Sequence, residues 1–135
     1  MEPLTRSGKR RRGFTLIEIL IVVSIIGILV SIAVPIYQKS ILRTRESVLR
    51  NNLFTIRTVL DEYTYDKQKA PQTLEDLVTE GYLRQVPYDP MTGTNEWKID
   101  MEDALRSVNQ TEPGIFDIHS RSDKKGLDGT PYAEW

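Results

Sequence analysis

The chain has 135 residues, with 18 Lys and Arg, 19 Asp and Glu, one histidine and no cysteine. This length leaves room for one small domain at most. The absence of cysteine excludes disulfides, thiol nucleophiles and cysteine-based metal sites, and the net charge of −1 gives no reason to expect nucleic-acid binding.

The first 13 residues form a basic leader, with five positive side chains and one acid, Glu2. After them comes the run Gly13-Phe14-Thr15-Leu16-Ile17-Glu18, and residues 19–36 carry no charge. At about 1.5 Å per residue, a helix over residues 14–36 is long enough to cross the ~30 Å core of a bilayer. The basic leader predicts that residues 1–13 stay cytoplasmic while the C-terminal part crosses. An ordinary secretory signal is the alternative, but its apolar core would be shorter and would end at small residues.

Glu18 is the unusual residue of this segment. Placing a carboxylate within the apolar core of a membrane costs roughly 2.5–3.5 kcal/mol, so a simple anchor would carry Leu or Val there. Two explanations stay open. The side chain either reaches back to the cytoplasmic interface, or it pairs with a positive group of another subunit, which low dielectric strongly favours over two unpaired charges.

The helical pattern continues beyond the apolar segment. Apolar residues recur at three-, four- and seven-residue spacings, and no Gly or Pro interrupts residues 36–66. We expect continuous helix to about Asp66, with the apolar stripe packed on a head; a dimeric coiled coil is disfavoured because the heptads are few and irregular. The stripe comprises Ile41, Leu42, Val48, Leu49, Leu53, Ile56, Val59, Leu60 and Tyr63, and the other faces carry Arg43, Arg45, Glu46, Arg50, Arg57, Asp61 and Glu62.

The rest of the chain predicts a small head. Thr73, followed by acids, indicates the start of a short helix over residues 73–80, and Gly81 suits its C-terminal cap. Residues 87–93 are dense in turn formers.

Two segments of the head alternate apolar and polar residues, 96–101 and 115–119, and they predict two short antiparallel strands. Residues 102–114 between them are expected to form a loop or hairpin connection. The predicted fold class is α+β, a long N-terminal helix packed on a small antiparallel sheet.

The polar tail, residues 120–135, contains two candidate metal ligands, Asp123 and Asp128. Their carboxylates, with nearby backbone carbonyls, have the hard oxygen atoms that calcium prefers. The spacing is not that of an EF-hand. Lys124 and Lys125 disfavour a cation there, and a solvated loop is the alternative.

The single histidine, His119, lies in the second predicted strand and is interpreted as an outward or half-buried strand residue. Catalysis would require a nucleophile or carboxylate beside it in the fold, which the sequence does not reveal. No phosphate-cradling loop such as a Walker A is present. We therefore expect no enzymatic activity.

The basic run before Gly13, residues 14–18 and Pro35 resemble the prepilin N-terminus of type IV pilins and type II secretion pseudopilins. The resemblance implies cleavage after Gly13 by a prepilin peptidase and methylation of the new amino terminus on Phe14. The mature chain would hold 13 Lys and Arg against 18 Asp and Glu, a net charge of −5. The implied pilin-like organisation is a leader at 1–13, a transmembrane and filament-core helix at 14–36, its amphipathic continuation at 37–70 and a globular head at 71–135.

The resemblance also implies roles in assembly. Glu18 would neutralise the amino group of Phe14 on an adjacent subunit and set the register of a filament. Pro35 removes the helical hydrogen bond to Ser31, and Gly27 is a second weak point, so residues 27–35 would lose helical bonds when subunits pack. Membrane helices also tolerate both residues without consequence.

Within these families the head is similar to that of a type II secretion major pseudopilin. The turn with Asp89-Pro90 and Gly93 and the region of residues 116–135 resemble a Pro-Asp-Pro-Gly-type turn and a C-terminal calcium loop, although one expected acid is replaced and Lys125 intrudes. The implied function is a structural subunit of the secretion pseudopilus, driven by a separate ATPase.

The expected location is the bacterial inner membrane, with a single span and a periplasmic head. The expected partners are copies of this chain, other pseudopilins, the prepilin peptidase, the inner-membrane assembly platform and lipid, but not nucleic acid. Two alternatives remain open: a type IV pilus major pilin for adhesion, twitching or DNA uptake, and a simple membrane-anchored periplasmic domain.

Overall fold

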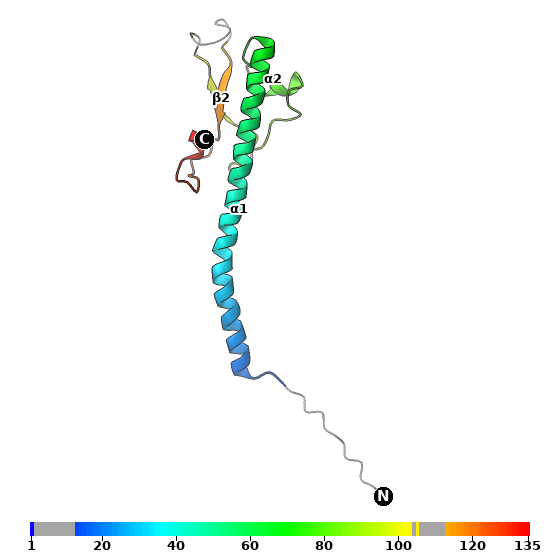
Figure 1. The fold of residues 1–135 in the computed structure, drawn as a ribbon, viewed down its shortest axis with the longest axis vertical. Helices are drawn as coiled ribbons and strands as arrows, with labels where there is room; N and C mark the ends of the chain where they lie inside the picture. The colour runs from blue at the N-terminus through cyan, green and yellow to red at the C-terminus, as the bar shows by residue number, and fades with distance from the viewer. Residues whose placement is uncertain (2–12, 104, 106–112) are drawn as a thin grey trace. The chain divides into compact units, whose positions relative to one another are not determined.

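The computed structural model describes residue 1, residues 13–103, residue 105 and residues 113–135. Its fold is α+β, as predicted, with the helices before the strands (Figure 1). The elements are α1 at Leu16–Lys67, α2 at Leu74–Thr79, β1 at Lys98–Met101, β2 at Ile115–His119 and a 3-10 turn at Tyr132–Glu134. The chain divides into two compact units, residues 1–39 and residues 40–135, and α1 contributes to both.

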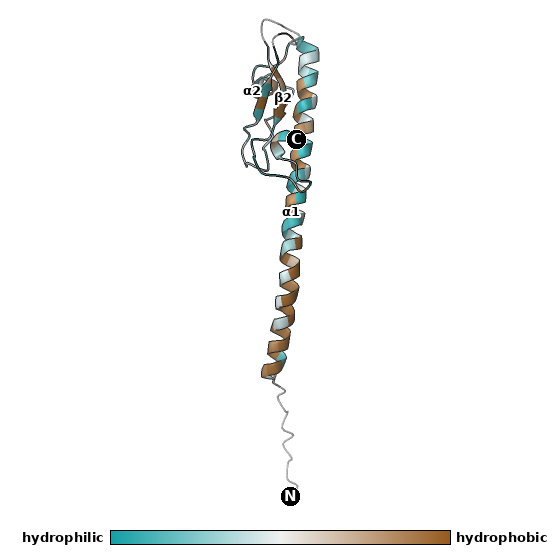
Figure 2. Cartoon of the chain, turned by 90° about the vertical axis from the view of Figure 1, so that its left-hand side faces the viewer, coloured by the Kyte–Doolittle hydropathy of each residue, from teal (hydrophilic) through white to brown (hydrophobic). Residues whose placement is uncertain are grey.

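In the first unit, α1 presents apolar side chains on every side. All residues from 14 to 39 are exposed, and this part of the helix is mostly hydrophobic in Figure 2. By length and composition, α1 can cross a membrane. Apolar surface of this extent calls for cover by lipid or by other helices.

The polar groups within this apolar stretch are satisfied inside the helix. The hydroxyl of Ser24 donates to the carbonyl of Leu20 at 2.7 Å, and that of Ser31 donates to the carbonyl of Ile28 at 2.7 Å. Pro35 lies inside α1, which remains helical on both sides of it. The helix is therefore compatible with hydrocarbon along this stretch, where unpaired polar groups are costly.

In the second unit, one face of α1 forms a wall of the hydrophobic core. It packs against Leu77 of α2, Trp97, and Ile115 and Ile118 of β2. Burying each large apolar side chain stabilises the fold by roughly 1.5–3 kcal/mol. The predicted continuation of the helix and its packing on the head are both confirmed. The buried residues of the stripe are Leu49, Leu53, Ile56, Val59, Leu60 and Tyr63.

The predicted stripe was wrong at its beginning. Ile41 and Val48 are 37% and 44% exposed, whereas Glu46, predicted on a solvent face, is only 8% exposed. The Glu46 carboxylate accepts hydrogen bonds from the C-terminal tail, which compensates for its burial. Periodicity alone could not reveal partners so distant in the chain.

Thr73 is the N-cap of α2, as predicted, and the structure shows a capping box there. Thr73 Oγ1 accepts the backbone N–H of Asp76 at 3.3 Å, and Asp76 Oδ2 accepts the backbone N–H of Thr73 at 2.9 Å. Gly81 follows with φ of +84°, the left-handed conformation that commonly ends a helix. Tyr82 then packs edge-on against Tyr63, with the ring centroids 5.3 Å apart, and so attaches the end of α2 to α1.

The sheet in the described structure has two antiparallel strands, with Ile99 opposite Ile118. β2 coincides with its predicted range, whereas β1 begins at Lys98, two residues later than predicted. Trp97 precedes β1 and is 2% exposed, and its indole N–H donates to the Pro87 carbonyl at 3.0 Å. This side chain therefore anchors the chain in the core at the start of β1.

The predicted turn over residues 87–93 is present, and a buried carboxylate holds it. The backbone N–H of Asp89 donates to the carbonyl of Thr94 at 2.7 Å, and Asp89 Oδ1 accepts the N–H of Met91 at 2.8 Å. Asp89 Oδ2 accepts the hydroxyl of Ser120 at 2.5 Å. Asp89 therefore joins this turn to the segment that follows β2.

Most of the predicted connection over residues 102–114 lies outside the described residues. At its end, a Cβ on Gly114 would come within 2.5 Å of the carbonyl oxygen of Pro71. The neighbouring Ile115 N–H donates to that same oxygen at 2.8 Å. Glycine at this position therefore lets β2 dock against the segment between α1 and α2.

Replacing Gly114 with alanine tests this close approach. Gly114→Ala is expected to lower the free energy of unfolding by about 1–3 kcal/mol, because backbone must move to admit the methyl group. Thermal unfolding of the full chain in detergent measures the effect. Gly27→Ala is the control, since nothing lies within 4 Å of a Cβ there in the single subunit. Equal melting temperatures for both variants would contradict the docking role of Gly114.

Candidate functional site

A capping box forms the N-terminus of α1. Thr15 Oγ1 accepts the backbone N–H of Glu18 at 3.2 Å, and Glu18 Oε2 accepts the backbone N–H of Thr15 at 3.4 Å. Sequence reasoning missed this role, although the spacing Thr-x-x-Glu before an apolar run signals it. Glu18 therefore has a partner within its own chain, a third explanation beside the two left open above.

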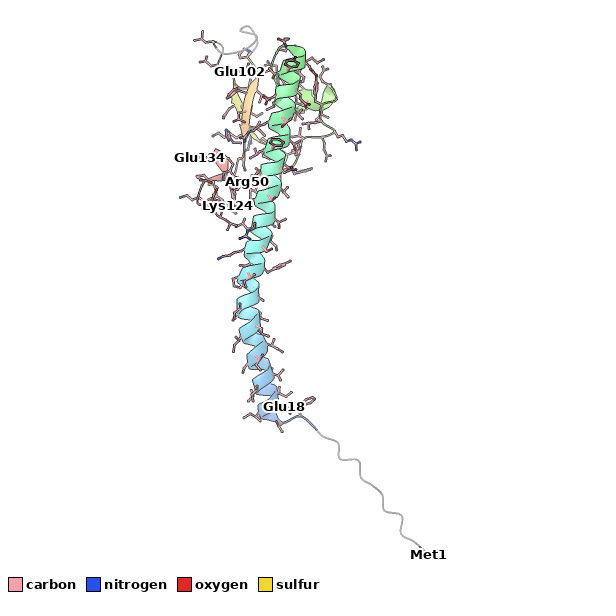
Figure 3. All side chains as sticks on the ribbon, viewed as in Figure 1. Met1, Glu18, Arg50, Glu102, Lys124 and Glu134 are labelled. Atoms are coloured by element: carbon pink, nitrogen blue, oxygen red, sulfur yellow. The ribbon has the colours of Figure 1, made fainter. Side chains whose placement is uncertain are left out.

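The capping interactions leave Glu18 able to act elsewhere. Both hydrogen bonds are longer than the usual 2.9–3.0 Å, so each is weak. No ion pair among the described residues includes Glu18. Its negative charge lies in the first turn of α1, where the helix dipole stabilises an anion. The Glu18 label in Figure 3 marks this end of the helix.

The predicted processing residues, Gly13 and Phe14, lie before the first residue of α1. Both are exposed, and the Phe14 side chain is 81% exposed. A peptide bond outside regular structure is more accessible to a peptidase than one within a helix. The basic residues that precede them in the sequence lie outside the described residues.

Asp128, one of the two predicted calcium ligands, is engaged by the protein. Its Oδ1 accepts both the N–H of Thr130 at 3.0 Å and the Thr130 hydroxyl at 2.7 Å. Its Oδ2 lies 3.5 Å from the guanidinium of Arg50. The hydrogen bonds from Thr130, and then the charge of Arg50, lower the pKa of this carboxyl below its ordinary value.

The surroundings of these residues do not fit a calcium ion. Calcium takes six to eight oxygen ligands, typically including several carboxylates. Among the described residues, no group of three or more His, Cys, Asp or Glu side chains is placed to hold a metal. Arg50 already neutralises Asp128, and Lys124 and Lys125 add positive charge beside Asp123. Calcium binding by Asp123 and Asp128 stays a prediction.

Glu46 of α1 takes part in holding the tail. Its Oε1 accepts the N–H of Leu127 at 2.7 Å and the hydroxyl of Tyr132 at 2.8 Å. Burial of Tyr132, followed by its hydrogen bond to the Glu46 carboxylate, raises the pKa of this phenol to about 12. Sequence reasoning found neither contact, because each joins residues more than 80 positions apart.

Arg57 and His119 meet at the carbonyl oxygen of Trp135. Arg57 donates to this oxygen at 2.7 Å and forms an ion pair with Asp117 at 2.7 Å. His119 Nδ1 lies 2.7 Å from the same oxygen, and its Nε2 lies 3.2 Å from Asp100 Oδ2. His119 is half-buried, as predicted. In the described structure, its contacts with Asp100 and Trp135 connect β2 with β1 and with the tail.

Comparison with known proteins gives the family. Residues 8–34 match the prokaryotic N-terminal methylation motif. The type II secretion system core protein G of Pectobacterium carotovorum subsp. carotovorum is 31% identical, over 96% of this chain and 84% of the relative. That of Klebsiella pneumoniae is 32% identical, over 91% of this chain and 89% of the relative. The chain belongs to the family of type II secretion system core protein G.

The match to type IV pilins is partial. A type IV major fimbrial protein of Dichelobacter nodosus is 44% identical, but over 46% of this chain and 39% of the relative. No solved structure was found to match the chain. The resemblance predicted from the sequence is confirmed: the family is that of a type II secretion major pseudopilin, and its role is structural and not enzymatic.

Proposed function

We propose that this chain polymerises through residues 14–36 into a type II secretion pseudopilus and so helps to drive folded proteins across the outer membrane. The observation that supports the proposal most directly is the apolar surface of α1, exposed on all sides over residues 14–39 apart from a few polar positions. Lipid covers such a surface in the membrane, and neighbouring copies of the same helix would cover it in a filament.

Helix packing rather than a hydrophobic driving force would stabilise the bundle, since lipid tails are as apolar as leucine. Small residues let helices approach closely, and Ser24, Gly27 and Ser31 recur at three- and four-residue spacing along α1. A Cβ on Gly27 would meet nothing within 4 Å in the single subunit, which leaves this position open to a neighbour. These residues are therefore candidates for the closest contacts between copies.

Glu18 would set the register between copies. Cleavage after Gly13 would create a positive amino group on Phe14, and a carboxylate in low dielectric is strongly stabilised by such a partner. Because the hydrogen bond that the Glu18 carboxylate accepts from its own helix end is long, giving it up would cost little, about 1 kcal/mol or less. Pairing with the Phe14 amine of an adjacent subunit would then offset the cost of a buried charge.

The proposed topology follows from the prepilin motif and the single apolar segment. Residues 1–13 would be a cytoplasmic leader, 14–36 the span in the inner membrane, 37–70 its amphipathic continuation, and 71–135 a periplasmic head. The prepilin peptidase, other pseudopilins and the inner-membrane assembly platform would be partners. The calcium site implied by the family resemblance is not part of this proposal, because Asp128 is engaged by Thr130 and Arg50.

The processing step predicts a defined mature terminus. Protein purified from the native host should begin at Phe14 and carry one additional methyl group on its amino nitrogen. Mass spectrometry of the N-terminal peptide measures both features. A chain that retains residues 1–13 while the secretion system is active would contradict the proposal.

Two substitutions separate the charge of Glu18 from its capping role. Glu18→Gln keeps an oxygen that can accept the Thr15 N–H but removes the charge, whereas Glu18→Leu removes both. Both variants should insert into the membrane normally and assemble at least about tenfold less than wild type, since an unpaired amine in low dielectric is disfavoured. Sheared filaments quantified against total membrane-inserted protein measure assembly. Normal filaments from Glu18→Gln would show that capping, and not the ion pair, is what assembly requires.

The segment at residues 27–35 is expected to change on assembly. Gly27 and Pro35 weaken the helix there, although α1 is helical throughout this range in the single subunit. We expect a filament density map to show this segment extended relative to the helix. A map with continuous helix through residues 27–35 would contradict the expectation.

A further inference from the structure

Several side chains of α1 fasten the C-terminal tail of the head to that helix, among them Glu46 and Arg50. Figure 3 shows the tail residues Lys124 and Glu134 on the side of α1 that carries Arg50. We propose that Glu46 and Arg50, together with Asp128, Tyr132 and Trp135, form a clasp that orders this loop without a bound calcium ion. The proposal concerns the folding of the head and is independent of how subunits assemble.

The first arm of the clasp is the buried carboxylate of Glu46. One oxygen, Oε1, accepts two hydrogen bonds from the tail, from the Leu127 N–H at 2.7 Å and the Tyr132 hydroxyl at 2.8 Å. Gly126 lies so close that a Cβ there would come within 3.1 Å of this oxygen. Hydrogen bonds to an ionised acceptor are stronger than neutral ones, and deleting the acceptor would leave two donors unpaired.

The second arm is Arg50, one turn further along α1. Its guanidinium carbon lies 4.3 Å from the centre of the Trp135 ring, and one of its nitrogens lies 3.5 Å from Asp128 Oδ2. Because the side chains of Arg50 and Asp128 are 64% and 48% exposed, the ion pair itself contributes little. Arg50 contributes more by placing its positive charge over the indole ring of Trp135 and by neutralising Asp128.

The tail closes the network on its own side. The Trp135 indole N–H donates to Thr130 Oγ1 at 2.8 Å, and Thr130 in turn donates to Asp128. The Trp135 and Tyr132 rings pack edge-on with centroids 4.9 Å apart. Asp128, Tyr132 and Trp135 are thus each held both by α1 and by a neighbour in the loop.

A divalent cation on Asp128 would conflict with this network. Calcium binds carboxylate oxygen at about 2.3–2.6 Å, which would place it within a few ångströms of the Arg50 guanidinium. It would also have to displace the Thr130 hydrogen bonds from Oδ1 or share Oδ2 with Arg50. In the described structure, the guanidinium of Arg50 thus already supplies the positive charge beside Asp128 that a bound cation would supply.

Limited proteolysis of the full chain in detergent tests the clasp, because trypsin cleaves after Lys124 and Lys125, inside the loop. For the wild-type protein we expect the same cleavage rate, within twofold, in millimolar calcium and in excess chelator. The melting temperature should likewise be unaffected by either condition. Faster cleavage or a lower melting temperature in chelator would overturn the proposal, and this comparison requires no variant to fold.

Variants then test the arms. Glu46→Leu should raise the cleavage rate at least about tenfold in both conditions, because two tail donors lose their acceptor. Glu46→Gln should have an intermediate effect, since an amide oxygen still accepts but carries no charge. Arg50→Gln, a change at an exposed position, should raise the rate more modestly. The matched control is Glu62→Gln, which alters an exposed carboxylate on the same helix and should cleave at the wild-type rate. Wild-type rates for Glu46→Leu and Arg50→Gln would overturn the clasp.

Discussion

Neither the sheet nor α2 is long enough to be stable alone, so both depend on packing against one face of α1. A two-stranded sheet is marginal in water even with good side-chain pairs, and a helix of six residues does not persist in isolation. The residues that α1 contributes, among them Leu49, Ile56 and Leu60, lie at the centre of the hydrophobic core. After the apolar segment, α1 carries apolar residues on one face only, and the head folds against that face.

Long-range polar contacts complete what the short elements cannot supply. The chain has no cysteine, so its loops must be fastened by hydrogen bonds and packing. Asp89 fastens the turn before β1 to the segment after β2, and Arg57 connects α1 with β2 and the end of the tail. Removing one partner of a buried contact of this kind leaves the other unpaired, which is more costly than the net value of the bond. A few residues of this kind are therefore enough to fix the tertiary arrangement of the head.

Most of the fold could be predicted because its signals are local. A few adjacent residues encode each of four features: the helix end near Asp66, the N-cap at Thr73, the turn at residues 87–93 and the strand at 115–119. The failures involve partners far apart in the chain. Glu46 was predicted on a solvent face because it is charged and falls outside the apolar stripe, while its partners lie more than 80 residues away. The same limitation hid the role of Arg57, whereas the capping role of Glu18 was encoded locally and was overlooked.

Glu18 and Glu46 lie on the same helix, and the difference between them separates assembly from folding. The tail donates two short hydrogen bonds to one oxygen of Glu46, so this carboxylate contributes to the stability of one subunit. Glu18 accepts one long hydrogen bond from its own helix end, and no cation of the described residues pairs with it. An acid in an apolar segment whose capacity is left largely unused stays costly until another molecule supplies the missing charge. Glu18 is thus suited to contacts between copies of the chain, whereas Glu46 stabilises the fold of a single copy.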